Sequence, residues 1–315
     1  MGRILISLLT AATLSAGDVP ATLQFRHLYT FGSKDGIHPP KALNKKAART
    51  ALGDPESPYG LAFPIGVATD EKNRVWIADN GTSSIHVFDG PHGSYREIRR
   101  VPGLASIQPA GITSDRTGRV YVSDAASGNI LVFDETGEFH RLLIPQRAGR
   151  LLESPTAIAV AENVRTIYIA DPPRRQIVVL NQEGETAGSI PLPPGFTAPS
   201  SLTVVGGLLH VLGPMQHALQ VMTQTGVLKG TQQWESVAFP SAFAHDFLRR
   251  RMFVANPRYM NVEVYQPDGA SVGVFGLSGD GAGQFRRVDS LHVDVQGLVY
   301  VVDSRHGKVV VFGER

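Results

Sequence analysis

The chain has 315 residues, of which 42% are hydrophobic and 18% charged, and it contains 33 glycines and 21 prolines. This composition fits a globular protein with many turns and excludes extended disorder. Because cysteine is absent, disulfide bonds, thiolate catalysis and thiolate metal sites are excluded, and a net charge of only +2 excludes a general attraction to nucleic acid or anionic membranes.

The N-terminal residues 1–21 have the layout of a secretory signal peptide. A basic residue, Arg3, precedes an apolar run from Ile4 to Leu14, and small residues follow at positions 15–17. The run is too short to cross a bilayer core of about 30 Å, and no other stretch is long and apolar enough to do so. We therefore expect export, with a secreted or periplasmic mature chain and no membrane span. The alternative is a buried N-terminal strand or helix.

Residues 34–63 form an insertion far longer than the usual connection of about 4 to 6 residues. Within it, Leu43, Ala47 and Ala51 recur every four positions, which predicts a short amphipathic helix between Pro40 and Gly53. Two roles are open for this insertion. It could act as a lid over the centre of the domain, or it could pack on the domain and cover apolar surface.

A repeating unit begins after the insertion. The stretch "VWIADNGTSSIHVFD" at 75–89 reads as strand, turn and strand, and "VYVSDAASGNILVFD" at 120–134 repeats it. Six such segments begin at Pro64, Pro109, Pro155, Pro199, Pro240 and Val288. They end at Asp79, Asp124, Asp171, Gly213, Asn256 and Asp303. Each unit continues through a polar turn into a third strand and, in most units, through a glycine-bearing turn into a fourth.

Four short strands in each unit of roughly 45 residues match one blade of a β-propeller. The predicted fold class is all-β, a six-bladed β-propeller of four-stranded blades that spans residues 22–315. One column of second-strand residues should fill the wedge between blades, because five of its six members are aromatic: Trp76, Tyr121, Tyr168, His210, Phe253 and Tyr300. A column of small residues should lie where the innermost strands converge: Gly66, Gly111, Ala157, Ser201, Ala242 and Ser290.

The last unit runs out of chain before its fourth strand. The segment "TLQFRHLYTFGSKDG" near the N-terminus reads like an orphan fourth strand, similar to "SVGVFGLSGDG" at 271–281. We therefore expect residues 23–31 to pair with residues 309–313 and to close the ring. Closure removes the exposed sheet edges that would invite aggregation.

The units resemble the NHL repeat family, whose pattern is P-x-G-I-A-V-D, then Y-V-A-D, then R-I-Q-V-F. The resemblance covers residues 22–315 and includes the linker "GDGAGQF" at 279–285. The fourth unit departs most, because Gly213 replaces the closing aspartate and the first turn is shortened at Gly206 and Gly207. The resemblance implies the propeller fold. Some similar propellers are lyases or lactonases with a metal at the axis, and some bind RNA.

The turns between second and third strands should share one face with the connections between blades. On that face the chain presents a basic and aromatic set, which suits an anionic or sugar-like ligand or a protein partner. This candidate binding set is Arg174, Arg175, His217, Arg258, Tyr259, Arg305, His306 and Lys308. The alternative is a set of solvated loops without a ligand.

A metal site at the axis has little support in the sequence. Propellers that resemble amidating lyases place histidines on several first strands, whereas here only His245 and His292 lie there, in different columns. Asp289 is the one first-strand carboxylate that could serve as a lactonase-like ligand. The recurring aspartates that close the second strands are interpreted as backbone caps. We expect no catalytic residue, no metal and no cofactor.

These patterns favour an exported, non-catalytic propeller that binds a protein, peptide or glycan on the face carrying the basic set. The alternative is a metal-assisted lyase or hydrolase with its site in the axial channel. RNA binding is disfavoured by the near-zero net charge and the expected export. We expect a monomer that binds no nucleic acid.

Overall fold

The computed structural model describes residues 23–32, 60–90, 92, 94–143, 152–161, 165–192, 196, 198–213 and 218–314. The predicted signal segment and the predicted helix between Pro40 and Gly53 lie outside the described residues, as does most of the 34–63 insertion. No helix among the described residues is long and apolar enough to cross a membrane.

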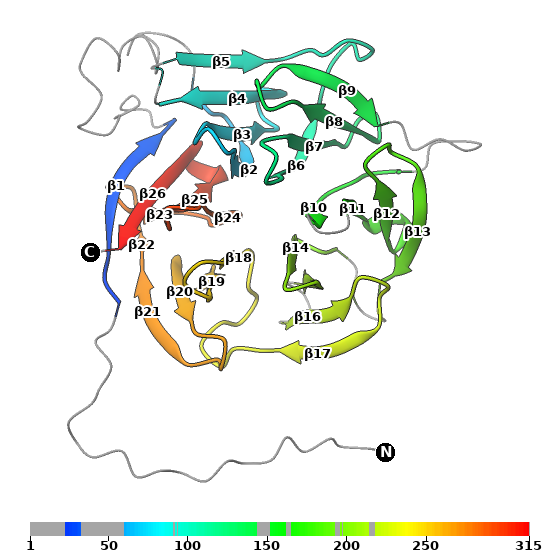
Figure 1. Cartoon of the computed structure of the whole chain (residues 1–315). Coiled ribbons are helices and arrows are strands. Elements are labelled where there is room, and N and C mark those ends of the chain that lie inside the picture. The colour runs from blue at the N-terminus through cyan, green and yellow to red at the C-terminus, as the bar shows by residue number, and fades with distance from the viewer. Residues whose placement is uncertain are drawn as a thin grey trace, which may run out of the picture.

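Six four-stranded antiparallel sheets surround a central axis like the blades of a propeller (Figure 1). Blade 1 consists of β2 (Pro64–Thr69), β3 (Val75–Asp79), β4 (Ser84–Asp89) and β5 (Ser94–Ile98). Blade 2 consists of β6 (Pro109–Ser114), β7 (Val120–Asp124), β8 (Asn129–Phe133) and β9 (Phe139–Leu143). Blade 3 consists of β10 (Ile158–Ala161), β11 (Thr166–Asp171), β12 (Gln176–Asn181) and β13 (Thr186–Pro191). The innermost strands of successive blades contact one another around the ring.

The remaining blades complete the circle. Blade 4 consists of β14 (Ser201–Val205), β15 (Leu208–Gly213), β16 (Ala218–Thr223) and β17 (Leu228–Gln232). Blade 5 consists of β18 (Phe243–Asp246), β19 (Arg251–Asn256), β20 (Asn261–Tyr265) and β21 (Ser271–Phe275). Blade 6 consists of β24 (Ser290–Val293), β25 (Val299–Asp303), β26 (Lys308–Glu314) and β1 (Phe25–Phe31). The short parallel pair β22 (Leu277–Ser278) and β23 (Gln284–Phe285) lies in the connection to blade 6. Single 3-10 turns follow β11 at Pro172–Arg174 and β25 at Ser304–His306.

The ring closes through the N-terminal strand, as the sequence predicts. β1 pairs antiparallel with β26, from Phe25 opposite Glu314 to Phe31 opposite Val309. Blade 6 therefore takes three strands from the C-terminal end of the chain and its outermost strand from the N-terminal end. Opening the ring would expose two blade faces that are now buried.

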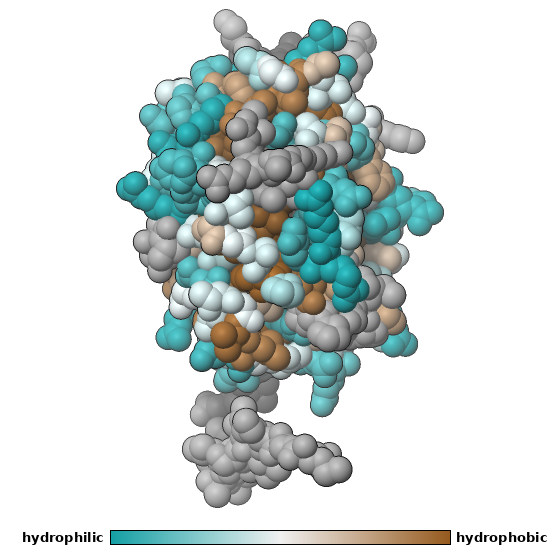
Figure 2. All heavy atoms as spheres, turned by 90° about the vertical axis from the view of Figure 1, so that its right-hand side faces the viewer, coloured by the Kyte–Doolittle hydropathy of each residue, from teal (hydrophilic) through white to brown (hydrophobic). Residues whose placement is uncertain are grey.

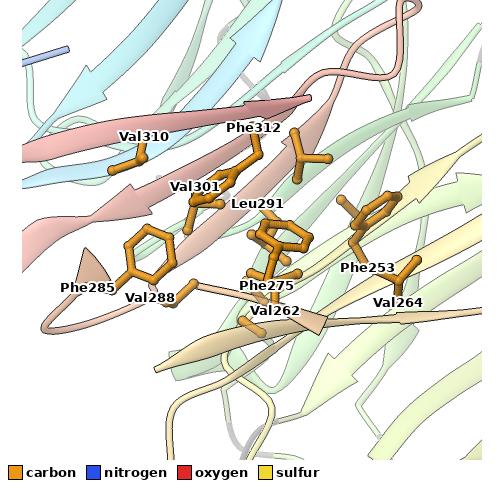
Figure 3. Close-up of a cluster of buried hydrophobic side chains, with 14 residues drawn as sticks. Phe253, Val262, Val264, Phe275, Phe285, Val288, Leu291, Val301, Val310 and Phe312 are labelled. Atoms are coloured by element: carbon orange, nitrogen blue, oxygen red, sulfur yellow. The ribbon is translucent and has the colours of Figure 1, made fainter. Parts of the chain in front are cut away.

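The hydrophobic core is divided among the blade interfaces. The described residues form six buried clusters, and each lies between two neighbouring blades. Figure 3 shows the cluster between blades 5 and 6, where Phe253 and Phe275 of one blade meet Leu291 and Phe312 of the next. Because every sheet is packed on both faces, whole strands such as β3, β7 and β25 are buried from end to end.

The aromatic column fills the wedges between blades, as predicted. Trp76, for example, belongs to the cluster shared by blades 1 and 2, and it is fully buried. The polar atoms of three members are satisfied by an aspartate six residues earlier in the chain. Trp76 Nε1 donates to Asp70 Oδ2 at 2.8 Å, and the hydroxyl of Tyr121 donates to Asp115 Oδ2 at 2.8 Å.

Small residues lie where the innermost strands converge, also as predicted. A Cβ atom added to Gly66 would lie 2.9 Å from Ile112 Cγ2 of the next blade, and one added to Gly111 would collide with the carbonyl oxygen of Thr156. The tight approach of the inner strands leaves little room for side chains there.

Candidate functional site

The second-to-third-strand turns share one face with the connections between blades, and buried aspartates join the two. In blade 1, Asp79 accepts hydrogen bonds from the amides of Ala62 (2.7 Å) and Phe63 (2.9 Å) in the incoming connection. It also accepts one from the amide of Thr82 in the turn, at 3.1 Å. We call this side of the molecule the connection face. The interpretation of the aspartates as backbone caps fits this geometry.

The same arrangement recurs around the ring. Asp124, Asp171 and Asp303 are fully buried and accept hydrogen bonds from amides of the connection that enters their own blade. In blade 5, Asn256 takes this place, with Nδ2 donating to the carbonyl of Ser236 at 2.9 Å. These groups are engaged by backbone groups and by neighbouring side chains, and they do not form a free carboxylate ring.

The connection face carries most of the candidate binding set. The side chains of Arg174, Arg175, Arg258, Tyr259 and Arg305 are exposed there. Arg258 lies over the ring of Tyr259, with 5.4 Å between the guanidinium carbon and the ring centroid. Arg174 makes a loose ion pair with Glu153, at 3.8 Å. His217 lies outside the described residues.

Two members of the set are engaged inside the protein. Lys308 is buried in β26 and therefore contributes little to the exposed surface. His306 lies between two carboxylates, because its Nδ1 is 2.6 Å from Asp303 Oδ2 and its Nε2 is 2.7 Å from Asp280 Oδ1. Asp280 also pairs with Arg286 at 2.5 Å, and these hydrogen bonds from Arg286 and His306 lower the pKa of Asp280 to about 2.

Two exposed aromatic residues of this face were missed at the sequence level. Phe63 and Phe239 each precede the proline that opens a blade, and their side chains are 41% and 52% exposed. Phe239 has a φ of +64°, which is uncommon for a bulky residue and persists only where its surroundings hold it. The sequence does contain a signal for them: the position before the opening proline is aromatic in blades 1 and 5, whereas it holds Gln108, Ser154 and Ala198 in blades 2 to 4.

Hydroxyl side chains in or just before the first two strands of the blades link neighbouring blades to one another. Five of the six interfaces have a hydroxyl that donates to a backbone carbonyl of the neighbouring blade or its connection: Ser114 to Thr69, Ser123 to Thr156, Thr156 to Pro199, Ser201 to Phe243 and Ser241 to Val288. These hydroxyls are therefore committed to holding the ring.

His292 joins the remaining pair, blades 6 and 1. Its Nε2 accepts a hydrogen bond from the backbone amide of Thr69 at 3.2 Å and lies 2.7 Å from the Thr69 hydroxyl oxygen. Because an amide can only donate, Nε2 carries no proton and the ring is neutral. Burial lowers the pKa of His292 to about 4, in agreement with this tautomer.

The other residues considered for metal chemistry are separated or engaged. His245 lies in the inner strand of blade 5, one residue further along than His292 in the inner strand of blade 6, next to the ring of Phe247, and burial lowers its pKa. Asp289 pairs with Arg287 at 2.6 Å and accepts the amide of Ser304 at 3.1 Å. Within the described parts of the chain, no group of three or more histidine, aspartate or glutamate side chains is arranged to hold a metal ion.

Blade 1 holds a buried serine and histidine pair below the connection face. Ser84 Oγ donates to Glu97 Oε1 at 2.9 Å and lies 3.1 Å from His86 Nε2, while His86 Nδ1 is 2.7 Å from the hydroxyl of Tyr95. Burial lowers the pKa of His86. Ser84 is fully buried, so its hydroxyl cannot meet a substrate without a rearrangement of the blade.

Comparison with known proteins supports the repeat and the fold. The NHL repeat model matches residues 61–88. No curated protein sequence matches the chain significantly. Among solved structures, a streptogramin B lyase has a TM-score of 0.64 at 13% sequence identity, covering 93% of this chain and 98% of that one.

Two further solved structures have the same fold. A virginiamycin B lyase from Staphylococcus aureus, a catalytically inactive histidine-to-alanine variant with quinupristin, has a TM-score of 0.61 at 12% identity and covers 92% of this chain and 99% of that one. A protein of unknown function from Bacteroides thetaiotaomicron has a TM-score of 0.65 at 14% identity, covering 94% of this chain and 76% of that one. At these identities the likeness concerns the fold alone. The chain is therefore a six-bladed β-propeller whose first blade matches the NHL repeat.

Proposed function

We propose that the protein is a binding propeller that recognises a protein, peptide or glycan on its connection face. The observation that carries this proposal is the sharing of one face by exposed aromatic and arginine side chains. Phe63, Phe239 and Tyr259 all lie on this face, and Tyr259 is 55% exposed. Aromatic residues and arginine dominate the binding energy of protein interfaces, so their exposure together favours a partner there.

The chemistry of the ligand follows from the side chains around these aromatic residues. Arg175, Arg258 and Arg305 supply fixed positive charge with planar donors that suit carboxylate groups. The stacking of Arg258 on Tyr259 holds both side chains in place before a ligand arrives, which reduces the entropy lost on binding. A polypeptide with acidic and apolar side chains fits this surface best, and an acidic glycan is the second possibility.

The proposed setting is outside the cytoplasm. The layout of residues 1–21 is typical of a signal peptide, and a periplasmic or secreted location would place the connection face in contact with envelope or extracellular polypeptides. We propose that the mature chain acts there as a monomer. Fusion of residues 1–30 to a reporter that is active only after export would test the location.

A ligand screen on matched variants tests the proposed binding face. A displayed random peptide library and a glycan array would be applied to the purified chain, to a variant with Phe239→Ser, Arg258→Ser and Tyr259→Ser, and to a control with Phe247→Ser and Leu248→Ser on the opposite face. Selected ligands should bind the connection-face variant at least tenfold more weakly and the control unchanged. Equal binding by the wild type and the connection-face variant would contradict the proposal.

A second candidate is a metal-assisted lyase or hydrolase with its site in the axial channel. The shared fold with streptogramin B lyase over most of both chains favours it. Elemental analysis of the purified protein and an assay with a streptogramin B antibiotic would test it. A stoichiometric divalent metal together with lyase activity on this compound would establish this candidate in place of the binding protein.

A further inference from the structure

The outermost strands of blades 3, 4 and 5 share a glycine at their midpoint. Gly188 of β13, Gly230 of β17 and Gly273 of β21 stand opposite Val179, Val221 and Val264 of the adjoining third strands. In blades 1 and 2 the same position holds Arg96 and Arg141, which donate to backbone carbonyls of the next blade. Glycine has no side chain that could make such a contact, so the outermost strands of these three blades have no side chain at this central position.

On blade 5 this bare edge receives an added segment of the chain itself. Leu23 forms a parallel bridge with Gly273, and its amide donates to the carbonyl of Val272 at 2.8 Å. The fit depends on the glycine, because a Cβ atom there would lie 3.0 Å from the carbonyl oxygen of Leu23 and 3.2 Å from its Cβ. The structure thus contains one worked example of strand addition to an outer blade edge.

The edge of β17 has the same local geometry, and no segment among the described residues is added to it. Both outer strands have a register shift next to the glycine, so Lys229 corresponds to Val272 and Gly230 to Gly273. Gly273 is buried beneath Leu23, whereas Gly230 is exposed and a Cβ atom there would meet nothing within 4 Å. The carbonyl of Lys229 corresponds in position to the carbonyl of Val272 that accepts the amide of Leu23.

Apolar surface lies beside this edge. Val227 and Leu228 at the start of β17 are 58% and 53% exposed. Figure 2 views the molecule from the right-hand side of Figure 1, where β12 and β13 lie, and it shows hydrophobic residues at the surface among hydrophilic ones. Exposed apolar side chains next to an unpaired strand edge are the features that an added strand uses, since backbone bonds and side-chain burial act together.

The edge of β13 is less suited to the same role. β13 ends at Pro191, which has no amide to donate, and its exposed residues near Gly188 are the small or polar Thr186, Ala187 and Ser189. β17 contains no proline, and its single charge is Lys229. Among the three glycine-bearing edges, β17 therefore combines an open backbone with apolar neighbours.

We propose that the edge of β17 binds an extended segment of a partner polypeptide, added as a parallel strand with an apolar residue over Gly230. The arrangement copies the one that Leu23 makes on β21. This site is separate from the connection face and lies on the outer rim of blade 4, so one propeller would hold two partners at once.

The experiment uses the protein's own added segment as a probe. A fluorescent peptide with the sequence of residues 20–27, blocked at both ends, would be titrated with the full-length chain and followed by polarisation. Gly230→Val should weaken binding at least tenfold, because its side chain would occupy the space of the added strand. The fold should persist, since that space is open and valine favours strands. The matched control, Gly188→Val on β13, should bind like the wild type.

A second probe separates backbone pairing from simple apolar contact. N-methylation of the leucine in the peptide removes the amide that corresponds to the donor of Leu23, and this peptide should also bind at least tenfold more weakly. The proposal would be overturned by equal affinity of the wild type and Gly230→Val, by loss of binding in Gly188→Val alone, or by no binding to the wild type. A concentration-dependent dimer that Gly230→Val abolishes would overturn it in favour of a second copy of this chain.

Discussion

One side chain between two blades, His292, makes the stability of the protein depend on pH. His292 links blades 6 and 1 through an Nε2 atom that must stay unprotonated to accept the amide of Thr69. Protonation would replace the acceptor with a donor and break the link. The broken hydrogen bond would weaken the interface between blade 1 and blade 6, and blade 6 contains both the first and the last strand.

The lowered pKa of His292 predicts a loss of stability in mild acid. The imidazole titrates near 6.5 when unfolded and at about 4 when folded, so above pH 6.5 both states are neutral and the stabilisation is complete. Between these values only the unfolded chain binds the proton, so His292 alone should contribute a fall of about 3 kcal/mol in the free energy of unfolding as the pH drops to 4, and His210, whose pKa burial also lowers to about 4, adds to this fall. Urea unfolding from pH 4 to 7 would measure this.

The control is His292→Gln, which keeps a hydrogen-bonding side chain that does not titrate. Its unfolding free energy should depend on pH less steeply than that of the wild type, by about 1.4 kcal/mol per pH unit between pH 4.5 and 6. Parallel pH profiles for the two proteins would show that the imidazole of His292 is not held neutral by the fold.

At the scale of the elements, five of the six blades are tied to their incoming connection by one buried polar side chain, and blade 4 has Gly213 at this position. Asp79 serves three amides, two from the connection and one from the turn, so it fixes the edge of the connection face at blade 1. Phe63 is one of the residues held in this way, and its exposed position therefore depends on a carboxylate that is itself fully buried.

Removal of the Asp79 carboxylate should lower the stability of the protein strongly. Asp79→Ala leaves three amides without their acceptor, and we expect it to lower the free energy of unfolding by about 3 kcal/mol or more, since each unsatisfied buried group costs about 1 to 3 kcal/mol. Asp79→Asn should lose less, because the amide oxygen of asparagine can still accept from Phe63 and Thr82, the two amides that Asp79 Oδ1 serves. Asp268→Ala, at an exposed turn where Asp268 accepts the amide of Ala270, serves as the control. An equal small loss in all three variants would contradict the assigned role.

The limits of sequence reasoning are clearest on the connection face. The recurrence of the closing aspartates placed all the turns on one side, because strand direction alternates and the repeat fixes where each turn falls. The pattern could not show that Lys308 is buried or that His306 is held by Asp280, since Asp280 belongs to a different segment of the chain. Phe63 and Phe239 were overlooked because they precede the repeat pattern and face solvent through the backbone conformation of the connections.

For the whole molecule, closure of the ring brings together segments that are far apart in the sequence. The pairing of β1 with β26 could be predicted because the last unit lacked a strand that the N-terminal segment supplied. The addition of Leu23 to blade 5 could not, because a single bridge leaves no periodic pattern in the sequence. Both contacts join the first described residues to the last two blades.

The most direct test of the account is a cross-link across the closing strands. Thr30 and Val310 face each other in the register of β1 and β26, and directly opposed residues lie at a separation that a disulfide can span. Because the chain has no cysteine, Thr30→Cys with Val310→Cys would introduce the only thiols. The account predicts a disulfide within one molecule upon mild oxidation and a higher melting temperature, with about 5 kcal/mol expected for so long a loop. Absence of the cross-link, or disulfides only between molecules, would contradict closure of the ring by the N-terminal strand.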